Sequence, residues 1–464
     1  MKFNKTHIAA VLMIMVLFSS CDKYLDVQPK GVVIPTTLDD YQALMSAPLK
    51  VNRTSNNIFY ATDEIQMPEV LRVAATGYAG KSGVNAYDFK DELYDVTEDD
   101  QDWNIAYSAL YIYNTVLAGI ESNKESDIKK KNQLKGEALV HRAFTYLILV
   151  NQYARHYSST ADTDPGVPMP LKPDINALLP RSTVKAVYAQ IEKDLLEAAD
   201  ILPETSTYTY RPNKAGAFGV LARMYLYIGD WAKTYEYANK AFLLSNLIYD
   251  FNNLAYLTPS NRVASQITGY PSSSVDKKNS VFYKYFTKVG AFNYNFLLSD
   301  DQYALFAPGD LRETFGTTDK DYYGKALPGI GVLENKPVYD YNNGGITTQE
   351  LILTRAEALA RTGKLGDALT DLNTLRKKRF TPATYADLQS TDPVTVLDLV
   401  LKERRIELAF TGLRLADIKR LNLEGRNISV KHGTVTVGPN DPRLVFPIPS
   451  KILSLNPNIV QNVR

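Results

Sequence analysis

Apolar side chains recur at helical spacing through the middle of this chain. The segment 135–157 places Leu139, Ala143 and Tyr146 three and four positions apart, which predicts a helix. The Pro-rich stretch 164–174 cannot continue that helix, and Ser182 is the expected N-cap of a second helix that ends near Leu202. The pattern therefore predicts a mainly α-helical protein.

An internal repeat joins two later segments. Residues recur at one spacing in two sets, which are Phe218, Ala222, Tyr225, Gly229, Ala238 and Ala241, and Ile352, Ala356, Leu359, Gly363, Leu372 and Leu375. This pattern is typical of a tetratricopeptide helix pair, in which small residues let two antiparallel helices approach and a Gly ends the first helix. We expect four to eight such helices to stack as a curved tetratricopeptide-like scaffold of helical hairpins.

Two segments lack the helical period. Residues 51–101 contain the breakers Pro68, Gly77, Gly80 and Gly83, and residues 251–345 are rich in Asn, Ser, Gly, Pro and Tyr. We expect them to form a loop-rich, irregular second lobe with few short strands. The helical scaffold then comprises approximately residues 21–50, 102–250 and 346–464. Long ordered loops on a rigid scaffold are where binding function usually lies.

The amino terminus has the pattern of an export signal. Lys2 and Lys5 precede an apolar run over residues 8–18, which is too short to span a bilayer and is followed by Ser19 and Ser20. We expect residues 1–20 to be a signal peptide and residues 21–464 to be one domain. Cys21, the only cysteine, stands where a lipoprotein is acylated, and two or three acyl chains would anchor the protein firmly to a membrane.

Charge and composition exclude several kinds of function. The chain has 464 residues, 52 basic and 51 acidic, so its net charge of +1 gives no field that would attract nucleic acid. One Cys and four His allow no internal disulfide and supply few metal ligands, so we expect no cofactor and no metal. The 31 Tyr beside 17 Phe favour surfaces that are apolar on one side and wet on the other, as in a binding site.

Several segments, in one order, resemble the SusD/RagB family of nutrient-binding outer-membrane lipoproteins. They read CDKYLDVQPKG from Cys21, DWNIAYSALYIYNTVL from Asp102, KGEALVHRAFTYLILVNQY from Lys135, ELILTRAEALARTGKLGDALTDLNTLRKKR from Glu350, and ERRIELAFTGLRLADIKRL from Glu403. The resemblance implies a surface-exposed, lipid-anchored protein of the outer membrane that performs no bond chemistry. It implies a SusC-like TonB-dependent transporter as partner and an oligosaccharide, or in some members a peptide, as ligand. It also implies that the helical scaffold faces the transporter while loops shape the ligand pocket.

Aromatic rings near the irregular segments are the candidate ligand contacts. Rings stack on the apolar faces of sugars while Asn, Gln and Asp bind hydroxyl groups. The candidates are Tyr87, Tyr94, Trp103, Tyr283, Tyr294 and Tyr322. Core packing is the competing interpretation of each ring.

Three other functions stay open at this point. An oligopeptide receptor of the same family would keep the architecture and change the ligand. A surface glycosidase would need two opposed carboxylates, for which the cluster Glu98, Asp99, Asp100 and Asp102 is the candidate; this cluster could also bind calcium or begin the helix that contains Trp103. A purely structural interaction scaffold would bind the transporter and no small ligand.

Two further motifs have structural interpretations. Residues 75–82, ATGYAGKS, satisfy a loose phosphate-loop pattern, but no buried strand precedes them and no amphipathic helix is expected after them, so we interpret them as a solvated turn. The charged residues between Arg404 and Arg420 are expected to lie on one helix, with pairs such as Arg414 and Asp417 that fix helix packing.

Overall fold

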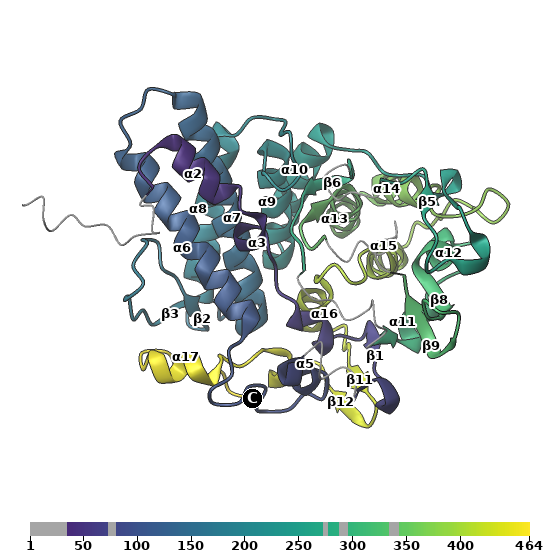
Figure 1. Cartoon of the computed structure of the whole chain (residues 1–464). Coiled ribbons are helices and arrows are strands. Elements are labelled where there is room, and N and C mark those ends of the chain that lie inside the picture. The colour runs from purple at the N-terminus through teal and green to yellow at the C-terminus, as the bar shows by residue number, and fades with distance from the viewer. Residues whose placement is uncertain (1–34, 73–79, 272–276, 287–295, 334–342) are drawn as a thin grey trace, which may run out of the picture.

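The computed structural model describes residues 35–464 apart from 73–79, 272–276, 287–295 and 334–342. Its scaffold is a series of helices in which consecutive members from α6 to α15 pack side by side (Figure 1). The long helix α13 packs against α10, although about a hundred residues of the irregular lobe separate them along the chain. The scaffold helices are α6 Gln101–Ser122, α7 Ile128–Tyr153, α8 Val184–Ile201, α9 Lys214–Ile228, α10 Trp231–Leu244, α13 Thr348–Arg361, α14 Leu365–Arg376, α15 Pro393–Glu407 and α16 Arg414–Leu423.

Side-chain caps explain where several scaffold helices begin. Asp100, Asp127 and Asn213 each accept a hydrogen bond from a backbone N–H in the first turn of α6, α7 or α9. The N-cap of α8 is Thr183, not Ser182 as expected, because Ser182 lies within strand β3, which continues to Thr183. The helices themselves are where the apolar periodicity predicts them.

The repeated segments form the two expected helical hairpins, α9–α10 and α13–α14. Gly229 and Gly363 have φ of 83° and 78°, a left-handed conformation that lets the chain leave α9 and α13 and turn back. Ala222, Ala238 and Ala356 are almost fully buried between the paired helices, so the small side chains permit close packing. The tetratricopeptide-like fold class is therefore confirmed.

The irregular lobe combines short helices with two-stranded antiparallel sheets, as expected. The short helices α2 Leu38–Met45 and α3 Pro48–Val51 pack against the scaffold helix α6, and the segments of the irregular lobe include η2 Asn57–Ala61, α5 Gly80–Tyr87, η3 Phe251–Asn253, η4 Pro259–Asn261, α11 Asp300–Tyr303 and α12 Leu311–Gly316. The strand pairs, some of which lie at the edge of the scaffold, are β1 Ile65–Gln66 with β7 Leu297–Leu298, β2 Pro165–Pro168 with β3 Arg181–Thr183, β4 Ala255–Tyr256 with β5 Ile267–Thr268, β6 Ser280–Phe282 with β10 Ile346–Thr347, β8 Thr317–Lys320 with β9 Ala326–Val332, and β11 Val430–His432 with β12 Val435–Val437. The chain ends with η7 Pro442–Leu444, helix α17 Ser450–Leu455 and an extended tail.

Helix α5 corrects the interpretation of the phosphate-loop pattern. Residues 80–87 form a helix and not a solvated turn, and its Val84, Ala86 and Tyr87 are buried. The Lys81 ammonium group binds the carboxylate of Asp95 at 2.7 Å. The positive charge of Lys81, which a phosphate would need as its partner, is therefore already neutralised. The preceding residues 75–79 of the motif lie outside the described part of the chain.

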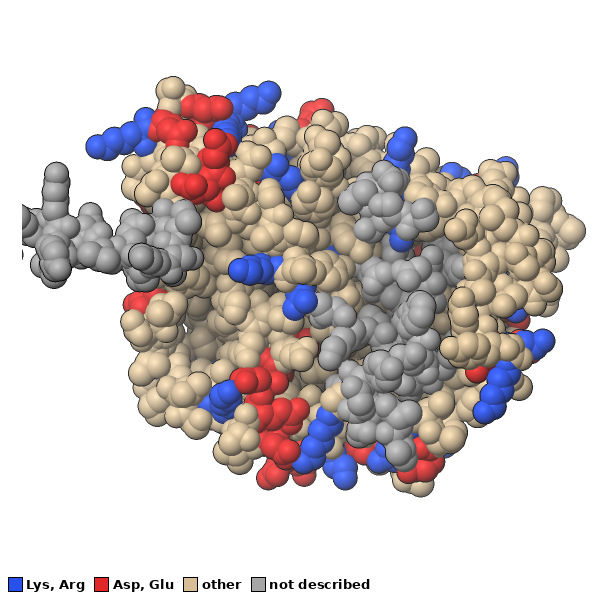
Figure 2. All heavy atoms as spheres, in the orientation of Figure 1, with Lys and Arg blue, Asp and Glu red and all other residues tan. Residues whose placement is uncertain are grey.

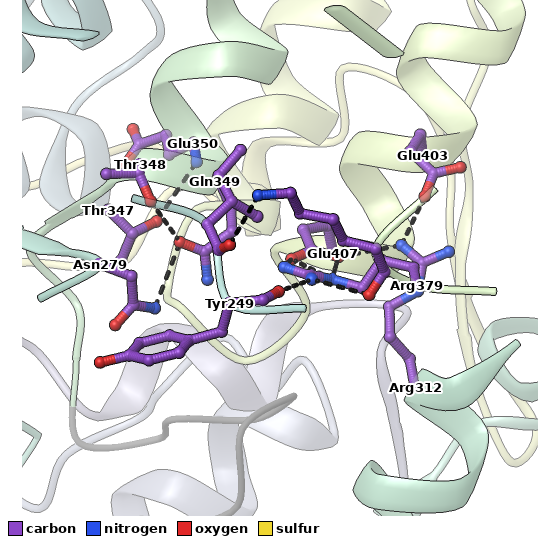
Figure 3. A network of polar contacts seen from close by, with 12 residues as sticks. Tyr249, Asn279, Arg312, Thr347, Thr348, Gln349, Glu350, Arg379, Glu403 and Glu407 are labelled. Carbon is purple, nitrogen blue, oxygen red and sulfur yellow. Dashed lines mark hydrogen bonds and ion pairs between the residues drawn. The ribbon is translucent and has the colours of Figure 1, made fainter. Parts of the chain in front are cut away.

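Buried ion pairs hold the irregular lobe against the scaffold. Figure 3 shows Arg312 and Arg379 directed at Glu407, with the Arg379 guanidinium also donating to the Tyr249 carbonyl oxygen at 2.7 Å. Asp310, Glu403 and Arg376 complete the network. Three arginines thus face three carboxylates, so the buried charges balance. This network joins α12 to the end of α14 and to α15.

The charged segment 404–420 differs from its prediction in two ways. It forms two helices, α15 and α16, because Phe410 and Gly412 take positive φ values of 61° and 79° between them. Asp417 pairs with Arg404 and Arg420, while Arg414 pairs with Asp63 of the irregular lobe. The cluster has the structural role that was expected of it, but the predicted pairing of Arg414 with Asp417 was wrong.

Candidate functional site

A groove of about 630 Å³ lies between α6, the segment after β2 and the C-terminal segment. Figure 2 shows the molecular surface hollowed on its left side, where Figure 1 places these three elements together. Residues from all three line it, among them Trp103, Asn104, Tyr107, Tyr111, Asn114, Pro168, Lys172, Asp174, Ile175, Leu178, Ile452, Leu455, Asn456 and Ile459. In the part of the chain that the structure describes, we identify this groove as the candidate ligand site because it combines aromatic rings with convergent amide groups.

Three aromatic rings on α6 form one wall of the groove. Trp103, Tyr107 and Tyr111 are four residues apart, so they share one helix face, with a backbone rise of about 6 Å from each residue to the next. The indole of Trp103 stacks on the ring of Tyr107, with centroids 4.6 Å apart and planes 28° apart. Exposure increases along the row, from 4% for Trp103 to 42% for Tyr111. The row therefore offers an apolar surface that is rooted in the core and open at one end.

Hydrogen bonds to two carbonyl groups fix the segment that faces this wall. The Tyr107 hydroxyl donates to the Pro168 carbonyl oxygen at 2.8 Å, and the Asn114 amide donates to that of Pro170 at 2.8 Å. Burial raises the pKa of Tyr107 well above its usual value, which keeps the hydroxyl protonated and able to donate. Both bonds hold the base of the segment against α6, while Lys172 and Asp174 lie farther out at the rim.

Two buried carboxylates fix the start of α6 and with it Trp103. Asp100 accepts hydrogen bonds from the backbone N–H groups of Asp102 and Trp103, and from the Tyr153 hydroxyl at 2.8 Å. Burial raises the pKa of Asp100 to about 6, and the nearby Asp102 charge adds to that shift. Asp102 accepts from the Ser55 hydroxyl at 2.6 Å and from the backbone N–H groups of Asn56 and Asn57 at 2.8 Å. The first irregular segment is thereby bound to the helix that carries the aromatic wall.

The acidic cluster therefore has structural partners rather than two opposed carboxylates. Asp99 binds the Lys451 ammonium group at 2.8 Å, and Glu98 accepts from the Asp95 backbone N–H at 3.1 Å. Of the described residues that line the groove, Asp174 is the only carboxylate. Hydrolysis of a glycosidic bond usually needs a pair.

Three of the predicted ligand contacts are packed in the core. The Tyr87 ring stacks on His432 at 3.9 Å and its hydroxyl accepts from the Met67 backbone N–H at 2.8 Å. Tyr94 and Tyr283 have exposed fractions of 6% and 8%. None of these three rings lines the groove, so packing explains their positions and we leave them out of the proposed binding surface.

The other predicted residues have different positions. Trp103 lines the groove. Tyr322 is 54% exposed at the β8–β9 turn, edge-on to Tyr323, and is separate from the groove lining. Tyr294 and the expected lipidation site Cys21 lie outside the described residues. Of the five candidates among the described residues, Trp103 alone lines the groove.

The sequence analysis missed Tyr107 and Tyr111. The signal was present, because Trp103, Tyr107 and Tyr111 recur every fourth residue in the helix DWNIAYSALYIYNTVL. Helix packing explains such a pattern equally well. What the sequence lacked was the opposing wall, which comes from residues 168–179 and 452–459.

The described residues contain neither a cluster of metal ligands nor a helix that could span a membrane. In those ranges no three His, Cys, Asp or Glu side chains come together as a metal site would require. Within the same ranges, no helix has the length and apolar character needed to cross a bilayer.

A helical-hairpin scaffold that carries an irregular lobe and an aromatic groove defines a class of binding protein. Residues 23–226 match a family model described as starch-binding and associating with the outer membrane, and residues 348–464 match the model of the SusD family. The chain belongs to the SusD/RagB family.

Relatives cover the chain almost completely. It is 25% identical to SusD-like protein P2 of Formosa agariphila over 530 aligned positions, which span 99% of each protein. A SusD superfamily structure from Bacteroides thetaiotaomicron matches with a TM-score of 0.70 at 22% identity, covering 92% of this chain and 100% of that one. A putative sugar-binding protein from Bacteroides vulgatus matches with a TM-score of 0.71 at 20% identity, covering 93% and 99%. Both solved structures share the fold.

Proposed function

We propose that this protein is a non-catalytic receptor that captures an oligosaccharide in the groove beside α6. The observation that carries the proposal is the row of Trp103, Tyr107 and Tyr111 along one wall. Tyr111 at the open end of the row is 42% exposed and can stack on the apolar face of a sugar ring, while the mutual stacking of Trp103 and Tyr107 fixes the buried end of the row. The polar side chains of Asn104, Lys172 and Asp174, which also line the groove, supply hydrogen-bonding groups for hydroxyls. Family membership and the sugar-binding name of a structural neighbour support the same ligand class.

The proposed cellular setting follows from the family. The receptor would be tethered to the outer membrane through acylated Cys21 and would pass its oligosaccharide to a SusC-like TonB-dependent transporter. The absence of a second carboxylate among the described groove residues supports capture without cleavage.

An oligopeptide is the second candidate ligand, because aliphatic side chains border the groove. Ile175, Leu178 and Leu455 are 79%, 53% and 64% exposed, and they would pack against the apolar side chains of a peptide. A sugar chain would use these groups less than it would use the aromatic row.

A binding screen with product analysis tests the proposal. The purified protein is titrated by calorimetry with linear neutral and acidic oligosaccharides and with apolar peptides of matched length, and each mixture is then analysed by chromatography. The proposal expects saturable binding of at least one oligosaccharide, recovered intact. Peptide binding alone would favour the second candidate, and shortened oligosaccharides would establish a glycosidase.

A further inference from the structure

The C-terminal residues 449–460, here called the flap, form a compact loop whose two ends are fastened together. The side-chain amide of Gln461 accepts from the Ile448 backbone N–H at 2.7 Å and donates to the Ile448 carbonyl oxygen at 2.8 Å. One side chain thus closes the neck of the loop, as in an Ω-loop. The flap contains α17 and is ordered by its own backbone hydrogen bonds, such as that from the Asn456 N–H to the Ile452 carbonyl oxygen at 2.9 Å.

The neck is anchored firmly to the scaffold. The Phe446 backbone N–H donates to the Gln152 carbonyl oxygen at 2.9 Å. The Asn462 side-chain amide donates at 2.7 Å to the carbonyl oxygens of Tyr153 and Phe446. Both acceptors on α7 lie at its C-terminal end, where the carbonyl groups have no partner within the helix. These contacts fix where the flap is attached.

The outer part of the flap has weaker attachments. Every residue of α17 keeps at least partial exposure. The Lys451 ammonium group pairs with Asp99 at 2.8 Å, but both side chains are well exposed, so the pair contributes little. A stable neck and a lightly held tip are the features expected of a segment that moves as a unit.

The flap meets the opposite wall of the groove along a short seam. The Asn456 amide donates to the Leu179 carbonyl oxygen at 2.9 Å, and the Asn458 amide donates to that of Leu178 at 2.8 Å. Leu178 and Leu179 belong to the segment 171–179, here called the strap, which lines the groove opposite α6. Because Ile452, Asn456 and Ile459 of the flap also line the groove, the seam closes the groove between the flap and the strap.

We infer that the flap is a gate, which opens at the Asn456 and Asn458 seam and pivots on the Gln461–Ile448 neck to widen the groove for a ligand. This inference concerns the groove of the proposed function and rests on it only for the identity of the ligand. Opening breaks the two neutral hydrogen bonds of the seam, the exposed Lys451–Asp99 ion pair and the hydrogen bond that Arg181 donates to the Val460 carbonyl oxygen at 3.0 Å, while the anchored neck stays intact. Ile452 and Ile459 lose packing when the flap lifts, and a ligand in the groove covers them again.

Fluorescence of Trp103 tests the gate without a ligand. The chain has two tryptophans, so Trp231→Phe leaves only the one in the groove. In that background, the double variant Asn456→Ala and Asn458→Ala is expected to raise the acrylamide quenching constant at least twofold. The matched control is Asn176→Ala, which changes an exposed asparagine whose backbone N–H binds Asp174 within the strap, and it is expected to leave quenching unchanged.

A reversible disulfide between the strap and the flap, here called the lock, is expected to change the quenching constant in the opposite direction. In a Cys21→Ser background, the pair Leu178→Cys and Asn458→Cys is introduced at the two residues joined by the seam hydrogen bond, so that a disulfide can link the strap to the flap. Oxidation is expected to lower quenching below that of the reduced form, and reduction is expected to restore it. The gate inference is wrong if the acrylamide quenching constant is the same in the double asparagine variant, in the Asn176→Ala control and in the oxidised and reduced forms of the cysteine pair.

The association rate of an oligosaccharide separates the gate from the receptor proposal. For a linear hexasaccharide that binds in the screen above, the oxidised lock is expected to slow association at least tenfold relative to the reduced form. If quenching changes with the seam variants as expected but no oligosaccharide binds, the gate is supported and the receptor proposal is contradicted. If the hexasaccharide binds with equal association rates to the oxidised and reduced forms, the receptor proposal is supported and the gate is contradicted.

Discussion

The carboxylate of Asp63 accepts two hydrogen bonds of 2.7 Å from the guanidinium of Arg414, and it also pairs with Arg405 at 3.1 Å. Arg405 belongs to α15 and Arg414 to α16, so one carboxylate of the irregular lobe joins two scaffold helices. The two arginines lower the pKa of Asp63 against the effect of its burial, which is the larger single influence. The irregular lobe is therefore fastened to the turn between these helices.

Asp63→Asn is expected to reduce the free energy of unfolding by roughly 3–5 kcal/mol, because it leaves two mostly buried guanidinium groups without their anion. Denaturant unfolding monitored by circular dichroism measures this change. The control is Asp398→Asn, which removes the partner of Arg426 in an exposed pair and is expected to cost under about 1 kcal/mol. Equal losses in the two variants would contradict the fastening role of Asp63.

Glu64 is expected to make stability fall as pH rises. Burial and the neighbouring Asp63 charge raise its pKa to about 8 from an ordinary value of 4.5. Between these two values the folded protein binds the proton more tightly than the unfolded chain, so folding loses up to about 1.4 kcal/mol per pH unit from this group. The loss is complete above pH 8, where both states are ionised.

Glu64→Gln is expected to remove this contribution. Denaturant unfolding of the variant and the wild type from pH 5 to pH 8 gives the difference between the two slopes. This difference isolates Glu64 from other groups, such as Asp100, whose pKa is raised to about 6. Parallel stability curves over that range would show that Glu64 is ionised throughout.

Two glycines near the turn of the second hairpin predict opposite effects. Gly363 has φ of 78°, so Gly363→Ala is expected to destabilise the protein by roughly 1–2 kcal/mol. Gly366 lies in the first turn of α14 with open space where a methyl group would be added, so Gly366→Ala is expected to stabilise by up to about 1 kcal/mol. Thermal unfolding of both variants measures the signs. A gain of stability in Gly363→Ala would contradict the backbone conformation at that turn.

Local patterns in the sequence predicted the scaffold but not its long-range contacts. The spacing of Ala222 and Gly229, repeated at Ala356 and Gly363, is enough to specify a hairpin because both helices of the pair lie within about 30 residues. Local spacing also pairs Arg414 with Asp417. The actual partner of Arg414 is Asp63, 351 residues away, which no local pattern identifies.

The candidate site shows the same limit. Trp103 was identified because it borders an irregular segment, but Tyr87 and Tyr283 lie in irregular segments too and do not line the groove. Composition indicates that tyrosines serve partly wet surfaces, and only the packing of distant elements decides which ones do. The groove needs Ile452 and Asn456, which lie at the far end of the chain from Trp103.

The most direct measurement is the affinity of Tyr111→Ala for an oligosaccharide that binds the wild type, compared with that of Tyr208→Ala. Tyr111 and Tyr208 are similarly exposed, at 42% and 45%, but only Tyr111 lines the groove. Calorimetry is expected to show at least a tenfold rise in Kd for Tyr111→Ala, which corresponds to about 1.4 kcal/mol, and none for Tyr208→Ala. Unchanged binding by Tyr111→Ala, with a loss in Tyr322→Ala, would contradict the groove and move the site to the β8–β9 turn.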